Sequence, residues 1–313
     1  MIRTGTHRLQ ADLALVLVAA VWGSTFIIVK DALEQVSTML FLTVRFSIAA
    51  IALAIIFRSR ASRSTGNRSA ELRAGLIVGL CLFSGYVLQT AGLRFTTAAK
   101  AGFITGFYIP LVPLLGALIY RRAPQFSEVL GVVLATAGTM LMTMESFRFE
   151  IGKGDLLVLG CSFAFALHIL ALGHFSKHVA FEKLTIYQVA IGALIGLATC
   201  GWIEPVRWHL TGGVVFALIL TALFATALAF AIQTWAQQFT TPTRTALIFS
   251  IEPVFAWVTS YFLAGEVLSG RAIGGAGLIL AGILAVELKP FGTRVRMPAE
   301  SGDPAASPRP LDS

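Results

Sequence analysis

Long apolar runs separated by short polar segments recur along the whole chain, and they constrain its fold more than any other feature. Ten runs are free or nearly free of charge: 13–29, 36–57, 74–93, 101–120, 129–144, 156–173, 184–203, 212–235, 245–264 and 272–287. A helix needs about 20 mostly apolar residues to cross a bilayer. The pattern therefore predicts ten transmembrane helices, of which 129–144 and 272–287 are the shortest.

The composition agrees with a chain whose main solvent is lipid. The 313 residues are 56% hydrophobic and 13% charged, with a mean hydropathy of +0.80, whereas soluble domains are about a quarter charged. Ten spanning helices use about 200 residues and leave about 100 for loops and tails. A soluble domain of ordinary size is excluded.

The basic residues indicate orientation in the membrane. A net charge of +8 could suggest nucleic acid, but the Lys and Arg residues are dispersed between the apolar runs. With a cytoplasmic N-terminus, 16 of the 24 Lys and Arg residues fall inside and seven outside, while Arg45 lies within a helix. Because inside loops carry the excess of positive charge, we predict a multi-pass protein of the plasma (inner) membrane with both termini cytoplasmic and no nucleic-acid partner.

The cysteines and histidines form no metal or redox framework. Cys81, Cys161 and Cys200 lie inside apolar runs, where thiols behave as small hydrophobes. His174 and His178 are four residues apart, which suits a metal on one helix face, but no third ligand accompanies them. The sequence predicts neither a disulfide nor a metal site, and no cofactor.

An internal repeat relates the two halves of the chain. Residues 88–97 read LQTAGLRFTT and residues 232–241 read IQTWAQQFTT, so that Gln89 matches Gln233 at an offset of 144. Each half carries five of the ten runs. An odd number of spans places the halves in opposite orientations, with a substrate path at their interface. The predicted fold is an all-α membrane protein of ten transmembrane helices as two inverted five-helix repeats.

The runs and the repeat also divide the chain. We expect a cytoplasmic N-terminal segment at 1–10, a first repeat at 11–144, an external linker at 145–154 and a second repeat at 155–288. The tail, 289–313, is rich in Pro, Ser and Ala and has no periodic pattern, so we predict that it is disordered and cytoplasmic.

Four motifs carry a family resemblance: WGSTF at 22–26, VRF at 44–46, AGFITGFYIPLVPLL at 101–115 and ALIFSIEPVFAWVTSYFLAGEVLSG at 246–270. With the ten-helix repeat, the chain resembles the EamA-type carriers of the drug/metabolite transporter superfamily over roughly residues 11–288. The resemblance implies export or exchange of small metabolites such as amino acids through a central cavity, without ATP. It does not supply the substrate.

Prolines predict interruptions in equivalent helices of the two halves. Pro253 lacks the N–H that would bond the carbonyl of Phe249, and Pro110 and Pro113 do the same in the fourth run. Paired breaks at corresponding positions point to the binding site of a carrier. The alternative is that each proline bends its helix for packing.

Three polar candidates lie well inside the predicted spans. Glu252 lies seven residues beyond Thr245, about 10 Å into the bilayer; it either binds a proton or a substrate amine, or is a structural carboxylate. Arg45 is favoured as a structural anchor over a site for a substrate carboxylate. His168 is either a hydrogen-bonded core residue or a proton-coupling partner of Glu252.

Amides and aromatic residues complete the candidate substrate site. Gln89 and Gln233 either bind substrate or tie their helices to neighbouring backbones. The aromatic candidates for cavity walls are Trp22, Tyr86, Tyr108, Phe165 and Trp235. Aromatic residues in membrane helices also serve plain packing.

The features favour a secondary transporter, most simply an exporter, that moves a small molecule by alternating access and couples to protons. The first alternative is a membrane-embedded enzyme for lipid-like substrates, but the acidic residues are scattered and no catalytic motif is present. The second is a passive channel or flippase. We predict no enzymatic activity, and the sequence leaves monomer and homodimer open.

Overall fold

The computed structural model describes residues 2–63, 67–121, 123–143, 151–264 and 269–287. The predicted disordered tail at 289–313 and most of the linker at 145–154 lie outside these residues. The described part is all-helical, and its only β-type pairing is an isolated bridge between Val36 and Trp208. The all-α class is therefore as predicted.

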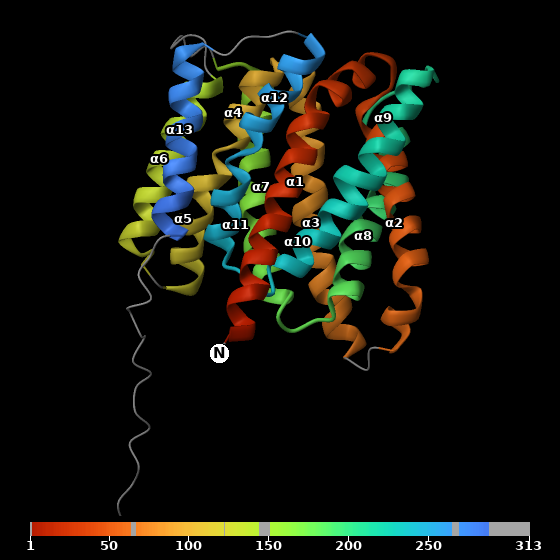
Figure 1. Cartoon of the computed structure of the whole chain (residues 1–313). Helices are drawn as coiled ribbons and strands as arrows, with labels where there is room; N and C mark the ends of the chain where they lie inside the picture. Colours follow the sequence, from red (N-terminus) through yellow and green to blue (C-terminus); the bar gives the residue numbers. More distant parts are fainter. Residues whose placement is uncertain (1, 64–66, 122, 144–150, 265–268, 288–313) are drawn as a thin grey trace, which may run out of the picture.

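Each half of the chain contributes a similar series of helices (Figure 1). The first half contains α1 (Ile2–Gln35), α2 (Thr38–Arg63), α3 (Arg68–Leu93), α4 (Ala98–Thr105), α5 (Tyr108–Tyr120) and α6 (Phe126–Thr143). The second contains α7 (Lys153–Phe175), α8 (Phe181–Ile203), α9 (Gly212–Ala222), the π-helix η1 (Leu223–Leu228), α10 (Ala229–Ala236), α11 (Pro242–Phe249), α12 (Glu252–Ala264) and α13 (Gly270–Glu287).

The helices identify a multi-pass membrane protein. Six segments are long and apolar enough to cross a bilayer: Thr38–Ala61, Arg68–Leu93, Lys100–Tyr120, Lys153–Phe175, Phe181–Ile203 and Gly212–Ala236. Helix α1 is a seventh if its two parts, which meet at 41°, form one span. The predicted runs 129–144 and 272–287 form the shorter apolar helices Phe126–Met142 and Gly270–Val286.

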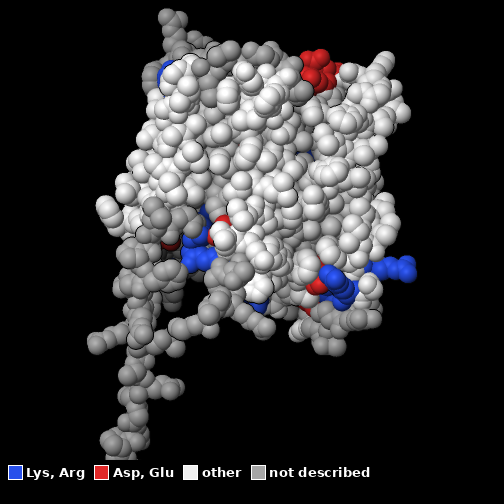
Figure 2. All heavy atoms as spheres, viewed as in Figure 1, with Lys and Arg blue, Asp and Glu red and all other residues white. Residues whose placement is uncertain are grey.

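The surface has the distribution of charge that a bilayer requires. In Figure 2, charged side chains gather near the upper edge and in the lower part, and the band between them is almost entirely uncharged. Large apolar side chains such as Leu118, Phe126 and Phe262 are 74%, 82% and 78% exposed. Such exposure is costly in water and suits a surface that faces lipid.

Helices of one half pack mainly against helices of the other. The partners of α2 and α6 are their own counterparts in the second half, α8 and α13. Helix α3 packs on α7, and in the same way α10 packs on α1. The packing is therefore nearly unchanged when the two halves are exchanged.

The contact between α6 and α13 depends on glycine. A Cβ on Gly138 would lie 2.5 Å from the carbonyl oxygen of Gly275, and one on Gly131 would lie 2.7 Å from that of Gly282. The four glycines are two pairs at the repeat offset of 144. Small residues allow two helix backbones to approach closely.

Helices α4 and α5 are separated by a break at Gly106–Phe107, and α11 and α12 by one at Ser250–Ile251, one repeat offset apart. At the breaks the N–H of Phe107 donates to Ile104 and that of Ile251 to Ile248, three residues back. Both breaks precede a proline, as predicted, but Pro113 lies within the continuous helix α5.

Candidate functional site

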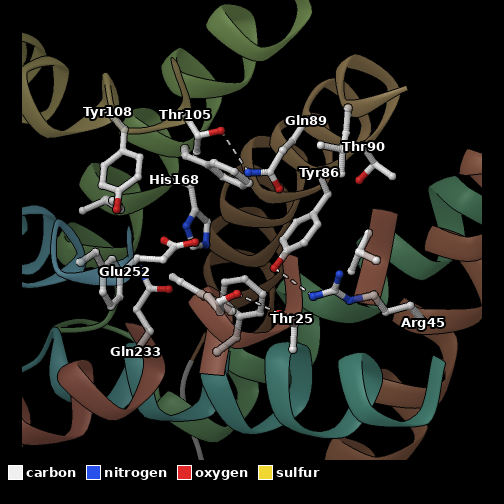
Figure 3. Close-up of a pocket in the computed structure, with 17 residues that line it drawn as sticks. Thr25, Arg45, Tyr86, Gln89, Thr90, Thr105, Tyr108, His168, Gln233 and Glu252 are labelled. Atoms are coloured by element: carbon white, nitrogen blue, oxygen red, sulfur yellow. Dashed lines mark hydrogen bonds between the residues drawn. The ribbon is translucent and has the colours of Figure 1, made fainter. Parts of the chain in front are cut away.

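A central cavity lies between the two halves, at the level of the two helix breaks (Figure 3). Its volume, taken as the space that the centre of a water molecule can occupy, is about 80 Å³. One water needs roughly 10–15 Å³ by this measure, so the cavity has room for about five to eight waters. Its walls come from α1, α2, α3, α4, α5, α7, α10, α11 and α12.

Eight of the nine predicted substrate-binding residues line this cavity: Trp22, Tyr86, Gln89, Tyr108, Phe165, His168, Gln233 and Glu252. Their binding of substrate stays a prediction. Trp235 does not line it and instead lies against Phe239, with ring centroids 5.4 Å apart. It is two residues beyond Gln233, hence turned by about 200° around the helix axis.

The sequence reasoning missed several lining residues as binding candidates: Thr25, Val29, Thr90, Leu93, Thr105, Ile169, Phe230 and Phe249. Threonine and aliphatic side chains in an apolar helix carry no signal of their own. The repeat could have found some of them, because Thr105 is the counterpart of Phe249, as Tyr108 is of Glu252, at the offset of 144.

Glu252 begins α12 directly after the helix break and is partly buried. Among the described residues, no hydrogen bond or ion pair holds its carboxylate, although four other ion pairs are present. Figure 3 shows it facing the cavity, between Tyr108 and Gln233. The carboxylate is therefore available to a ligand or a proton.

Arg45 lies on the other side of the Tyr86 hydroxyl in the same view and is only 4% exposed. Its Nε donates to Thr226 Oγ1 at 2.7 Å, and its Nη2 to the Tyr86 hydroxyl and the Ala225 carbonyl at 3.3 Å each. All three acceptors are neutral. Its guanidinium carbon also lies 4.7 Å from the centroid of the Tyr86 ring.

The π-helix η1 provides the acceptors for Arg45. The Ala225 carbonyl within η1 accepts from Arg45, and Trp22 Nε1 also donates to it at 2.9 Å. Thr226 Oγ1 donates to the carbonyl of Thr221, five residues back. Such π-type turns occur frequently at functional sites. The apolar sequence of this segment predicts an ordinary helix.

His168 belongs to a buried chain of hydrogen bonds. Its Nε2 is 2.9 Å from Gln188 Oε1, and Gln188 Nε2 donates to Thr234 Oγ1 at 2.8 Å. No hydrogen bond joins it to Glu252 in the described structure, although both side chains line the cavity. The predicted coupling role thus requires a route across the cavity.

Further amides close the cavity toward the lower face, which we define as the side where α1 and α11 begin (Figure 1). Gln233 Nε2 donates to Gln237 Oε1 at 3.3 Å, and Gln237 Nε2 to the Ile169 carbonyl at 3.0 Å. Gln237 is fully buried, whereas its counterpart Leu93 lines the cavity. The cavity therefore extends toward the opposite, upper face.

Two equivalent ion pairs join the halves near the two faces. Toward the lower face, Arg244 donates hydrogen bonds to both carboxylate oxygens of Asp12, with donor–acceptor distances of 3.0 and 2.7 Å. Toward the upper face, Lys100 Nζ lies 2.6 Å from Asp155. Lys100 and Arg244 are 144 residues apart, and Asp12 and Asp155 are 143 apart. The upper pair is the more exposed, since the Lys100 side chain is 35% exposed against 7% for Arg244.

The described residues contain no group of three or more His, Cys, Asp or Glu side chains that could hold a metal. His174 and His178 lie near the lower end of α7, where His178 Nδ1 is 2.8 Å from the His174 carbonyl. The central cavity therefore has one basic residue, Arg45, and one acidic residue, Glu252, in its walls.

The sequence profile of the EamA-like transporter family matches residues 9–144 and again residues 152–288. The chain belongs to this family. The resemblance read from the motifs is thereby confirmed, and this EamA-like chain is a membrane transporter.

Relatives cover nearly the whole EamA-like chain. An Archaeoglobus fulgidus protein, named an uncharacterized transporter, is 35% identical over 285 residues, which cover 91% of this chain and 88% of that protein. A Salmonella typhimurium protein, named a probable amino-acid metabolite efflux pump, is 25% identical over 305 residues, covering 90% and 95%. A solved crystal structure matches with a TM-score of 0.74 and 19% identity, covering 89% of this chain and 96% of its own. That likeness concerns the fold alone.

Proposed function

We propose that this chain is a secondary transporter that exports small metabolites, such as amino acids, across the inner membrane by alternating access, without changing them chemically. The observation that carries the proposal is the central cavity, which both halves line and which buried amides close toward the lower face. The name of the Salmonella typhimurium relative supports efflux of an amino-acid metabolite.

The proposed architecture is ten spans in two inverted five-helix halves. Beyond the long helices, this count takes α6 and α13 as short spans and α11 with α12 as one broken span, like α4 with α5. Five crossings per half reverse the orientation of the second half. The packing that is preserved on exchange of the halves supports this arrangement.

The lower face is proposed to be cytoplasmic, with both termini on that side. The excess of Lys and Arg in the segments assigned to that side supports this orientation. The cavity would then extend toward the outside, and Asp12–Arg244 would hold the cytoplasmic side closed.

Alternating access requires a second state in which the halves exchange roles. Both pairs are formed in this structure, and each alternate state would break one of them, because each pair bridges the halves near one face. The near-symmetry of the packing supports two such states of similar energy, since each half can adopt the arrangement of the other.

Glu252 is the proposed coupling carboxylate, with His168 as its partner. Arg45, Tyr86 and Tyr108 line the same cavity. Glu252→Gln keeps the shape of the side chain but removes its ability to release a proton. We therefore expect the variant to be folded and monodisperse and to lose pH-dependent transport.

The test begins with thermal stabilisation of the purified protein by a panel of amino acids, amines, sugars and organic acids over a range of pH. Flux of the stabilising compound is then measured in proteoliposomes with and without a proton gradient. Glu34→Gln is the control, because Glu34 is exposed near the end of α1. Flux that does not saturate with substrate and does not depend on an ion gradient would identify a channel instead. An unchanged pH profile of transport in Glu252→Gln would show that Glu252 is not the coupling residue.

A further inference from the structure

Arg45 and Glu252 are two opposite charges in one cavity, and neither is neutralised by a described residue. Among the described residues, the other charged side chains that are buried form ion pairs, as in Asp12–Arg244 and Glu71–Lys183. An uncompensated charge in the interior of a membrane protein costs several kcal/mol unless water or a ligand meets it. The two charges therefore point to a ligand that bears charges of its own.

The guanidinium of Arg45 is fixed but still has donors to spare. Thr226, Tyr86 and Ala225 accept from Nε and Nη2 only. Among the described residues nothing accepts from Nη1, and the side chain lines the cavity. A guanidinium held in place with free N–H groups suits a carboxylate, which it binds with directed, charge-assisted hydrogen bonds.

Neither charge is needed by the scaffold of the repeat. The counterpart of Arg45 is Tyr187, whose side chain packs over Gly75. The counterpart of Glu252 is Tyr108, which is buried and bears no charge. The equivalent helix of the other half packs with a tyrosine at each of these two positions. The two charges therefore serve something other than helix packing.

The remaining wall selects the rest of the ligand. Trp22, Phe165, Phe230 and Phe249 form an aromatic surface of linked rings; for example, the centroids of Trp22 and Phe249 are 4.9 Å apart. This surface suits an apolar group. Room for about five to eight waters, at about 30 Å³ of liquid volume each, suits a ligand no larger than a short aliphatic amino acid.

We propose that the substrate is a small zwitterionic amino acid with an apolar side chain, whose carboxylate binds Arg45 and whose ammonium binds Glu252. Tyr86, which lies between the two in Figure 3, adds its hydroxyl beside the carboxylate. This inference rests on the proposed transport function and assigns the chemistry of its site. It makes Arg45, favoured from sequence as an anchor, part of the binding machinery.

The first experiment uses the wild-type protein and compares ligands with both charges against ligands with one. Binding is measured by calorimetry in detergent for L-valine, γ-aminobutyrate, isobutylamine and isovalerate. We expect L-valine to bind at least about tenfold more tightly than either single-charge analogue, since a charge-assisted contact is worth at least about that factor, and more tightly than γ-aminobutyrate, which has no apolar side chain. Equal affinity for zwitterion and analogues would overturn the proposal, and this arm needs no variant to fold.

The second experiment assigns each charge to its residue. Arg45→Gln should lower the affinity for the preferred zwitterion at least about tenfold and leave isobutylamine within about twofold. Glu252→Gln should give the same loss for the zwitterion and leave isovalerate unchanged. Arg73→Gln, at an exposed position on α3, is the matched control and should change nothing. Equal losses for isobutylamine and zwitterion in Arg45→Gln would return Arg45 to a structural role.

Flux measurements separate this inference from the proposed function. Wild-type proteoliposomes that move none of the compounds in the transport panel would contradict the transporter. Wild-type proteoliposomes that move amines or acids as readily as zwitterions would leave the transporter standing and refute the zwitterion site.

Discussion

At the scale of single residues, the sequence indicates which side chains are chemically unusual but not which way they face. Glu252, His168 and Gln233 were identifiable because polar groups are costly in apolar helices, and all three reach the cavity. Trp235 was chosen for its residue type alone, and its angular position on α10 turns it away. Thr226 carried no signal, since its importance depends on a π-turn and on Arg45 from the other half.

Thr226→Val tests how firmly Arg45 is held. The change is nearly isosteric but removes the acceptor of a buried charged donor, so we expect a loss of about 1–3 kcal/mol in unfolding free energy. Thr221→Val is the control, because Thr221 is equally buried and bonds only to backbone carbonyls of its own helix. Thermal unfolding in detergent compares the two, and equal losses would show that Thr226 does not anchor Arg45.

At the scale of elements, the apolar pattern predicts where the helices lie, because burial in lipid and helix length are both encoded in it. The paired breaks followed from Pro110 and Pro253. The π-helix at Leu223–Leu228 could not be predicted, since α- and π-turns expose the same apolar surface and the segment contains neither Pro nor Gly. The close packing of α6 on α13 follows from glycines that match at the repeat offset.

Gly138→Ala should destabilise the protein, although alanine is the better helix former. The new Cβ would meet the Gly275 carbonyl and Ile279, so α6 and α13 must separate. We expect a cost of about 1–3 kcal/mol. Gly277→Ala on α13 meets nothing within 4 Å and should be neutral or stabilising. Unfolding temperatures of the two variants decide the matter: a stable Gly138→Ala protein would contradict the tight contact.

At the scale of the whole molecule, the two halves share one packing scheme but differ in the residues that line the cavity. The difference appears at equivalent positions, since Leu93 lines the cavity while Gln237 donates to the Ile169 carbonyl. The repeat could be predicted from sequence because its two copies contain matching residues. Which of two equivalent residues lines the cavity could not be predicted, because it depends on how the halves pack.

Thiol labelling of Leu93→Cys and Gln237→Cys, in a background without Cys81, Cys161 and Cys200, tests the exchange between states. Both positions are buried, so both cysteines should be protected in this background. Adding Asp12→Asn, which weakens the pair with Arg244, should raise labelling at position 237 at least about threefold, because a buried pair that loses one partner is strongly destabilised. The exposed Asp31→Asn is the control. Unchanged protection at 237 would exclude Asp12–Arg244 as a latch.

The single occurrence of Arg45 and of Glu252 bears on why the two halves are joined in one chain. In a dimer of identical five-helix chains, the two-fold axis would copy every charge, so the chamber would carry each charge twice. Covalent fusion of a duplicated unit lets each copy change alone. One arginine and one glutamate, each present once, can then face the same chamber, which a dimer of identical chains cannot provide.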